Sequence, residues 1–255
     1  RFAASFQSKR RFVILAGLSG SGKTQLPKLW AEWLGCNHLN CVVPVGPDWN
    51  SRDLLLGWKN PLSDKTWEET RVSEILREAA EHPDESFFIV LDEMNLSHVE
   101  RYFADFLSAM EVDGTVMLDK PIIYPENIYF VGTVNIDETT YSFSPKVLDR
   151  AHTIEFKVPF EEIAREQSNV DRAPKSSVEN VDKNIWFLQL KEARYLKQTD
   201  KEDCLKKLEA LYECLSDTNH LFAHRTAQEI KSLVARLIFL GLPFAQAMDI
   251  AILQK

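Results

Sequence analysis

The sequence has 255 residues, of which 45% are apolar and 27% charged, a composition typical of one large globular domain or of a core with a small satellite. A formal net charge of −8 argues against a surface built for wrapping nucleic acid, because phosphate contacts require a surplus of lysine and arginine. The sequence has no apolar run as long as a membrane span, and its four cysteines form no CxxC pair, so we expect reduced thiols in a cytoplasmic protein.

Short apolar runs alternate with helical patterns over the first 160 residues. Strands are predicted for residues 12–16, 41–45, 87–91, 128–134 and 153–156. Helices are predicted for residues 26–34, 72–81 and 99–110. Continuous apolar strands that alternate with helices predict an α/β fold, with a parallel five-stranded sheet sandwiched by helices.

Three local signals refine this pattern. Pro27 is expected to bend the first of these helices, which Gly35 should close. Pro44 suggests that the second strand lies at a sheet edge, because proline cannot donate to a ladder. The pair Asp113-Gly114 predicts a β-hairpin within residues 112–124.

From about residue 161 onward the pattern is helical only, and no internal repeat is found. Helices are predicted for residues 161–167, 185–197, 203–216, 226–240 and 244–254. Because residues 168–177 are polar, we expect an α/β core (1–160), a linker (161–182) and a small all-helical lid (183–255). We interpret the chain as part of a longer protein, with the lid continuing beyond residue 255.

A phosphate-binding loop is the strongest motif. Gly17-Leu-Ser-Gly-Ser-Gly-Lys-Thr24 matches G-x-x-x-x-G-K-[ST] in full, between a predicted strand and a predicted helix. Its backbone N–H groups and the helix N-terminus attract phosphate oxygens. Lys23 should reach the β- and γ-phosphates, and the Thr24 hydroxyl should bind Mg²⁺. The predicted nucleotide-binding residues are Gly17, Ser19, Gly20, Ser21, Gly22, Lys23 and Thr24.

Polar residues at the ends of two later strands complete this prediction. Asp92 and Glu93 follow the most apolar strand, at the edge where open α/β sheets bind ligands. We expect Asp92 to hold the Mg²⁺ shell and Glu93 to activate the attacking water as a general base. Asn135 ends the strand 128–134 and is expected to orient that water. The alternatives are two solvated acids and a turn-forming asparagine.

This combination resembles the AAA+ superfamily over nearly the whole chain. More narrowly, three stretches resemble the McrB family, the motor subunits of modification-dependent restriction systems. They are Leu91-Asp-Glu-Met-Asn-Leu96, Gly132-Thr-Val-Asn-Ile-Asp-Glu-Thr139 and Ser144-Pro-Lys-Val-Leu-Asp-Arg-Ala151. The resemblance implies a homo-oligomeric, usually hexameric ring, an McrC-like nuclease partner, and a DNA-reading domain N-terminal to this sequence. Glu138 and Leu96 depart from the family pattern, which leaves ATP or GTP open as the substrate.

The resemblance also assigns two arginines. Arg150 matches the arginine finger, which would reach the γ-phosphate bound by the neighbouring subunit and supply about 10³ to 10⁵ in rate. Lys146 is a second candidate for that role. Arg225 matches the position called sensor 2, which would couple the γ-phosphate to lid closure. The alternatives are a surface arginine paired with Asp149 and, for Arg225, a helix-start arginine bonded to local carboxylates.

Three functions remain open on the sequence. The first is a restriction-type AAA+ motor that drives DNA translocation by a nuclease complex. The second is an AAA+ ATPase of the MoxR or dynein-related type that remodels proteins, and the third is a scaffold ring with little turnover. Residues 46–70, with three tryptophans, and residues 112–124 are insertions that either line a pore, grip a partner or pin a loop to the core.

Overall fold

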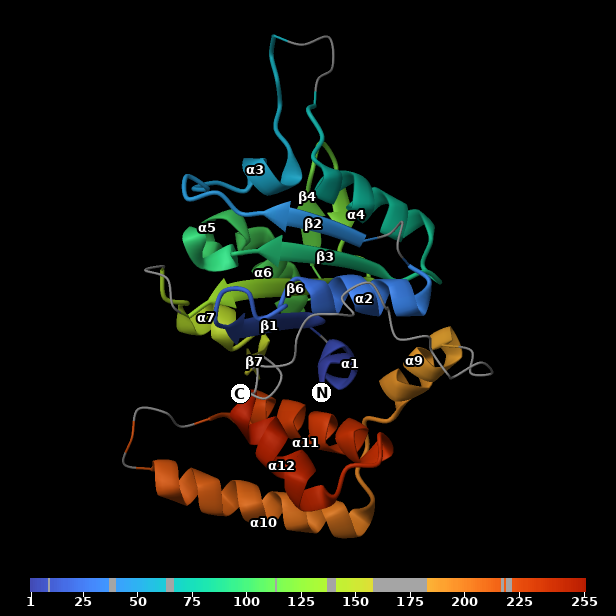
Figure 1. Ribbon diagram of the computed structural model, residues 1–255, viewed down its shortest axis with the longest axis vertical. Helices are drawn as coiled ribbons and strands as arrows, with labels where there is room; N and C mark the ends of the chain where they lie inside the picture. The colour runs from blue at the N-terminus through green and yellow to red at the C-terminus, as the bar shows by residue number, and fades with distance from the viewer. Residues whose placement is uncertain are drawn as a thin grey trace, which may run out of the picture.

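The computed structural model describes residues 1–8, 10–36, 40–62, 67–112, 114–136, 141–157, 183–216, 218 and 222–255. Its centre is a sheet of β1 (Phe12–Gly17), β2 (Asn40–Pro44), β3 (Phe87–Asp92), β6 (Ile128–Asn135) and β7 (His152–Phe156). The strands lie in the order β2-β3-β6-β1-β7, and every neighbouring pair is parallel (Figure 1). The predicted five-stranded parallel sheet is therefore confirmed, and Pro44 lies on an edge strand as expected.

Helices and short elements surround this sheet (Figure 1). In the first part of the chain they are α1 (Phe2–Phe6), α2 (Gln25–Leu34), α3 (Asp53–Leu56), α4 (Arg71–Glu81), the 3-10 helix η2 (Met94–Leu96), α5 (Val99–Tyr102), α6 (Ala104–Val112) and α7 (Pro145–Leu148). A two-stranded antiparallel ribbon pairs β4 (Thr115–Met117) with β5 (Pro121–Ile123). The C-terminal part holds α9 (Lys183–Glu192), α10 (Gln198–Leu215), α11 (His224–Phe239) and α12 (Phe244–Leu253).

Aromatic packing shows that both faces of the sheet are covered. Phe130 on β6 packs against Phe103 and Phe106, with ring centroids 5.0 and 4.7 Å away. The preceding residue, Tyr129, packs at 5.5 Å against both Phe6 of α1 and Phe187 of α9. Since successive strand residues point to opposite faces, α5 and α6 cover one face, and α1 and α9 the other. This explains why the central strands are continuous apolar runs.

The structure refines three local predictions. Pro27 lies in the first turn of α2, which begins at Gln25, and a proline there removes no intrahelical hydrogen bond. The predicted helix 99–110 is two helices, which meet at Phe103. The β-hairpin predicted within residues 112–124 is confirmed, because β4 pairs antiparallel with β5; its turn follows Met117, and Asp113 is outside the described residues.

The C-terminal helices form a second apolar cluster. Ile230, Leu233 and Val234 of α11 pack with Met248 of α12, and Ala4 of α1 joins the same cluster. Since other residues of α1 belong to the core cluster, α1 connects the sheet with these helices (Figure 1). α9 ends at Glu192, earlier than predicted. The expected helix 161–167 and the linker 161–182 lie outside the described residues, so the domain boundaries remain predictions.

The insertion 46–70 is partly attached to the core. Trp49 packs edge-to-face on Tyr102 at 5.3 Å, and Trp67 also contacts the core cluster. Trp58 is 45% exposed, although its backbone pairs with Glu68. Two of the three tryptophans thus fit the interpretation that they pin the loop, and a role in gripping a partner remains a prediction for Trp58.

The structure bears on two compositional expectations. Within the described part of the chain, no helix is both long and apolar enough to cross a membrane. All four cysteines are free thiols, three buried and Cys214 exposed. Arg10, just before the first strand, is only 4% exposed, and its Nε lies 3.4 Å from Glu229 Oε1.

Gly132 on β6 allows Met94, in the turn that follows β3, to pack closely against the sheet. A Cβ added at Gly132 on β6 would overlap the sulfur of Met94, which is fully buried against it. We expect Gly132→Ala to lower the free energy of unfolding by about 1–3 kcal/mol, because the core has no room for the extra methyl group. Chemical denaturation measures this change.

A double mutant provides the control. Met94→Ala vacates the space, so Gly132→Ala should cost markedly less in the Met94→Ala background than in the wild-type protein. Equal costs in both backgrounds would contradict the packing assigned here.

Candidate functional site

The loop after β1 has the backbone that a phosphate cradle requires. Gly20 and Gly22 have φ values of 74° and 89°, a left-handed region that favours glycine. No atom lies within 4 Å of a Cβ placed at either glycine, so the requirement is conformational rather than steric. The loop leads directly into α2, whose N-terminus carries a partial positive charge.

Lys23 lies over this loop. Its side chain is buried, and Nζ donates to the Gly17 carbonyl at 3.0 Å, to the Leu18 carbonyl and to the Ser21 hydroxyl at 3.3 Å. These acceptors are neutral. A phosphate oxygen would accept a stronger, charge-assisted hydrogen bond from the same ammonium group. The lysine is thus placed where the motif predicts.

Asp92 joins the phosphate loop to the middle of the sheet. Its Oδ1 accepts hydrogen bonds from the Thr24 hydroxyl at 2.7 Å and from the Thr133 hydroxyl at 2.6 Å. Thr133 Oγ1 in turn accepts from the backbone N–H of Glu93 at 2.9 Å. The hydroxyl of Thr133 therefore fixes both acidic residues that follow β3.

Glu93 is held by its backbone and by Asn135. Its φ of 53° and ψ of 44° are left-handed, a conformation that a non-glycine residue adopts at a cost of order 1 kcal/mol or more. Asn135 Nδ2 donates to Glu93 Oε1 at 3.0 Å. The strained turn and the amide together aim the Glu93 carboxylate, which is the arrangement that a positioned general base needs.

These side chains line one cavity of about 310 Å³ at the carboxyl edge of the sheet. Its lining residues are Ser19, Gly20, Gly22, Lys23, Thr24, Gln25, Asp92, Glu93, Thr133 and Asn135. The strand register explains why these residues lie together at one edge. Gly17 of β1 pairs with Asn135 of β6, and Pro44 of β2 pairs with Asp92 of β3, so the parallel strands all end at this edge. The structure therefore brings together the predicted phosphate-binding, metal-binding and water-activating residues.

The donor set fits Mg²⁺ bound together with phosphates. Among the described residues, no group of three or more histidine, cysteine or acidic side chains could hold a metal alone. One hydroxyl (Thr24) and one carboxylate (Asp92) converge here instead. Mg²⁺ is commonly held in this way, with the remaining ligands supplied by water and substrate phosphates.

The two predicted arginines lie elsewhere. β7 begins beside Val13, near the start of β1, and Arg150 precedes β7 by two residues. Arg150 is therefore at the amino edge of the sheet, opposite its own phosphate loop. Its side chain is 7% exposed, so Arg150 is not a surface residue, although its Nη1 lies 3.7 Å from Asp149 Oδ2 and so makes the pair that the alternative interpretation expects. Lys146 is exposed on α7.

Arg225 shares the location of Arg150. It donates to Glu111 at 2.9 Å and to Asp149, as a helix-start arginine bonded to carboxylates would. Arg150 donates to the same Glu111. Neither arginine lines the 310 Å³ cavity. Their roles toward a nucleotide stay predictions.

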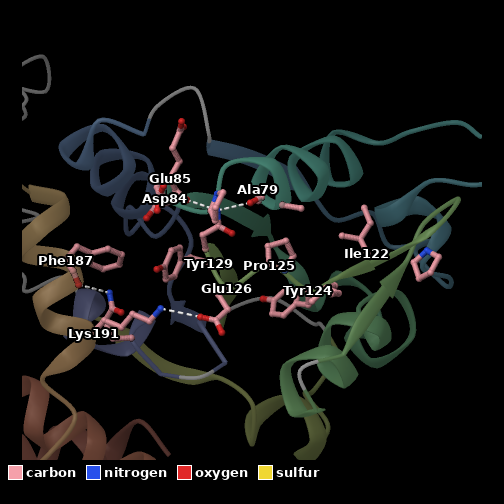
Figure 2. Close-up of a pocket in the computed structure, with 17 residues that line it drawn as sticks. Ala79, Asp84, Glu85, Ile122, Tyr124, Pro125, Glu126, Tyr129, Phe187 and Lys191 are labelled. Atoms are coloured by element: carbon pink, nitrogen blue, oxygen red, sulfur yellow. Dashed lines mark hydrogen bonds and ion pairs between the residues drawn. The ribbon is translucent and has the colours of Figure 1, made fainter.

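A larger cavity of about 810 Å³ lies at the amino edge of the sheet (Figure 2). Tyr124, Pro125 and Tyr129 line it, with Lys191 paired to Glu126 at 3.5 Å on its rim. It contains none of the predicted site residues. We therefore assign the chemistry to the smaller cavity, on the grounds of its side chains rather than its size.

Comparisons with known proteins identify the family. Residues 12–151, more than half of the chain, match the profile of the AAA domain (dynein-related subfamily). The chain belongs to the dynein-related subfamily of AAA domains. Residues 177–255 match a domain of unknown function (DUF8727). A comparison with curated proteins found no significant match.

A solved structure of similar fold agrees with this AAA assignment. It is that of a "putative ATPase" from Cytophaga hutchinsonii ATCC 33406, with a TM-score of 0.62 and 17% sequence identity. The alignment covers 96% of this chain and 77% of that chain. At this identity the likeness concerns the fold alone. The AAA+ prediction is thus confirmed, and with it a P-loop nucleotide-binding ATPase domain, whereas the narrower likeness to McrB is not shown.

Sequence reasoning missed two residues, Thr133 in the 310 Å³ cavity and Glu111 beside the two arginines. Thr133 lies two residues before Asn135 and so points to the same face of β6, a spacing that could have identified it. Glu111 contacts Arg150 and Arg225 from positions 39 and 114 residues distant, and no local pattern could have revealed it.

The Thr133 hydroxyl can be tested directly. Thr133→Val removes the acceptor of the Glu93 N–H and a donor to Asp92, so we expect the free energy of unfolding to fall by about 1–3 kcal/mol. We also expect Mg²⁺-dependent binding of a fluorescent nucleotide to weaken about tenfold. Thr133→Ser keeps the hydroxyl and is the matched control. Identical behaviour of the valine and serine variants would contradict the role assigned to this hydroxyl.

Proposed function

We propose that this chain is the motor module of a homo-oligomeric ring that hydrolyses a nucleoside triphosphate with Mg²⁺. The observation that carries the proposal is the convergence of Lys23, Thr24, Asp92, Glu93 and Asn135 on one cavity. Hydrogen bonds that run through Thr133 join the last four of these residues. Membership of the AAA domain family supports the same conclusion.

Each side chain has a distinct task in hydrolysis. Lys23 and the loop N–H groups bind the β- and γ-phosphates, and Thr24 and Asp92 hold the metal. Mg²⁺, when bound, neutralises charge on the β- and γ-phosphate oxygens. Glu93 accepts a proton from the attacking water, and Asn135 keeps the Glu93 carboxylate oriented for that transfer.

The position of Arg150 supports a shared active site. Because Arg150 lies at the sheet edge opposite its own phosphate loop, it cannot reach the γ-phosphate bound by its own subunit. A neighbour that docks this edge against its own carboxyl edge would receive the guanidinium beside its nucleotide. A closed ring repeats such a heterologous contact at every boundary, and the resemblance to the McrB family implies that the ring has six subunits.

Two biological settings are compatible with this core. The McrB-like stretches support a restriction motor with an McrC-like nuclease partner, and DNA bound through a separate domain. The dynein-related AAA match supports a protein-remodelling ATPase at least as well. Stimulation of hydrolysis by an McrC-like nuclease would favour the first, and stimulation by a protein substrate the second. A scaffold ring with little turnover fits less well, because the catalytic set is intact.

Two substitutions separate binding from hydrolysis. Lys23→Ala should weaken nucleotide binding about 100-fold, because it removes charge-assisted hydrogen bonds to the phosphates. Glu93→Gln should bind normally but hydrolyse about 10² to 10⁴ times more slowly, because it lacks the base. Titration calorimetry and phosphate release, with ATP and GTP in parallel, measure both effects. Lys28→Ala, on the exposed side of α2, is the control. Wild-type turnover in Glu93→Gln would rule out the assigned base.

Mixing variants tests the shared site. Arg150→Ala binds nucleotide but lacks the finger, so its turnover should fall by about 10³ or more. Lys23→Ala retains the finger but binds nucleotide too weakly to hydrolyse it at the concentration used. A mixture should recover part of the wild-type rate, because some boundaries then combine an intact loop with an intact finger. Full activity of the wild-type protein as a dilute monomer would contradict the ring.

A further inference from the structure

Two arginines share one carboxylate where the α/β core meets the C-terminal helices. Glu111, at the end of α6, accepts from Arg150 Nη2 through Oε2 and from Arg225 Nη1 through Oε1, the latter at 2.9 Å. Asp149 accepts from Arg225 Nη2. Glu111 thus holds, at one point, the finger candidate from the core and the sensor candidate from α11.

Arg150 is enclosed by this arrangement. Its Nε donates to the Leu107 carbonyl at 2.9 Å and its Nη1 to the Lys146 carbonyl at 2.8 Å, while Nη2 is bound to Glu111. Asp149 Oδ2 also lies 3.7 Å from Nη1. With 7% of its side chain exposed, the guanidinium cannot reach another subunit in this state. The Glu111 side chain is 40% exposed and can rotate into solvent. Glu111 is therefore the movable part of the enclosure.

The surrounding charges favour an anion. The described residues of this cluster include five cations against three carboxylates, an excess of two positive charges in a chain of net charge −8. The cations are Arg10, Arg150, Arg225, Arg236 and Lys255, and the carboxylates are Glu111, Asp149 and Glu229.

A cavity provides room at this cluster. It has a volume of about 320 Å³, and its charged lining residues are three arginines and two glutamates: Arg10, Arg225, Arg236, Glu111 and Glu229. Arg236 is 4% exposed, and within the described part of the chain its Nε has no hydrogen-bond partner. Burial lowers the pKa of Arg236 to about 10, which leaves it charged at neutral pH. The cluster around this cavity therefore carries more positive than negative charge, and the cavity opens to solvent.

We propose that Glu111 is a positioning residue that binds Arg150 and Arg225 in the free subunit, an arrangement that we call the sheath. When the ring assembles, both arginines leave Glu111 and bind the triphosphate of a neighbouring subunit. Both arginines then act on the neighbour's nucleotide. The inference rests on the proposed ring function and adds its regulation.

The exchange has a simple physical basis. Glu111 and Asp149 together offer two negative charges to the two guanidinium groups, whereas a triphosphate offers more charge and more acceptor oxygens. An exposed carboxylate is held weakly, so releasing it costs little. Only subunits whose arginines are released from Glu111 can bind a neighbour in this way. The apparent affinity between subunits is therefore the intrinsic affinity multiplied by the fraction of subunits in the released state. Weakening the sheath should therefore strengthen assembly.

The first test measures hydrolysis rate against protein concentration. We expect Glu111→Gln to lower the concentration of half-maximal activity about three- to tenfold, with no rise in thermal midpoint. Glu111→Asp, which keeps the charge but shortens the reach, should shift it in the same direction. Glu74→Gln removes a comparable exposed partner, 3.0 Å from Arg71 on α4, and should leave it unchanged. A merely structural Glu111 would lower activity and stability at every concentration.

The second test locates the effect in the subunit that donates the arginines. Glu111→Gln is added either to the Lys23→Ala subunit, which donates the finger, or to the Arg150→Ala subunit, which binds the nucleotide. We expect the mixture to gain activity at low concentration only in the first case. An equal effect in both cases, or none in either, would overturn the sheath while leaving the ring intact. A wild-type rate per subunit that does not depend on concentration would overturn both the sheath and the proposed function.

Discussion

The Asp92 carboxylate accepts hydrogen bonds from two hydroxyls, Thr24 at 2.7 Å and Thr133 at 2.6 Å, and the site depends on this contact. It joins the loop after β1, the end of β3 and the end of β6. These three segments come close only because β1 and β3 both pair with β6 in parallel. The sheet topology therefore supplies the geometry, and the short polar network makes it specific. Glu93 and Asn135 extend the network to the place where water must attack.

Much of this arrangement could be predicted from local patterns. The strands were recognisable as unbroken apolar runs, and the phosphate loop as a motif with a strand before it and a helix after it. Asp92, Glu93 and Asn135 could be nominated because carboxyl ends of parallel strands share an edge. The effect of Pro27 could not be predicted, because it depends on the residue at which α2 begins, and the composition around it does not show this.

Contacts between distant segments could not be predicted. The burial of Arg150 follows from a carbonyl 43 residues away and a carboxylate 39 residues away. Arg225 meets Glu111 across 114 residues, because α11 packs beside the amino edge of the sheet. No periodicity or motif encodes such a meeting. In the proposed ring, the two edges of the sheet have different tasks: one edge binds the nucleotide, and these arginines at the other edge neutralise charge on the nucleotide of a neighbouring subunit.

This division explains why the core alone leaves the biological setting open. The residues that bind and hydrolyse a nucleotide are the same whether the ring moves DNA or unfolds a protein. Differences between those settings lie in insertions such as residues 46–70, where Trp58 is exposed, and in parts that attach to the ring.

A crystal structure with Mg²⁺ and a non-hydrolysable nucleoside triphosphate tests the central claim most directly. The account predicts phosphates within hydrogen-bond distance of the backbone N–H groups of residues 20–24, Lys23 turned from its loop carbonyls to a phosphate oxygen, and the metal between Thr24 and Asp92. A nucleotide bound instead in the cavity beside Tyr124 and Tyr129, with Lys23 unmoved, would contradict it.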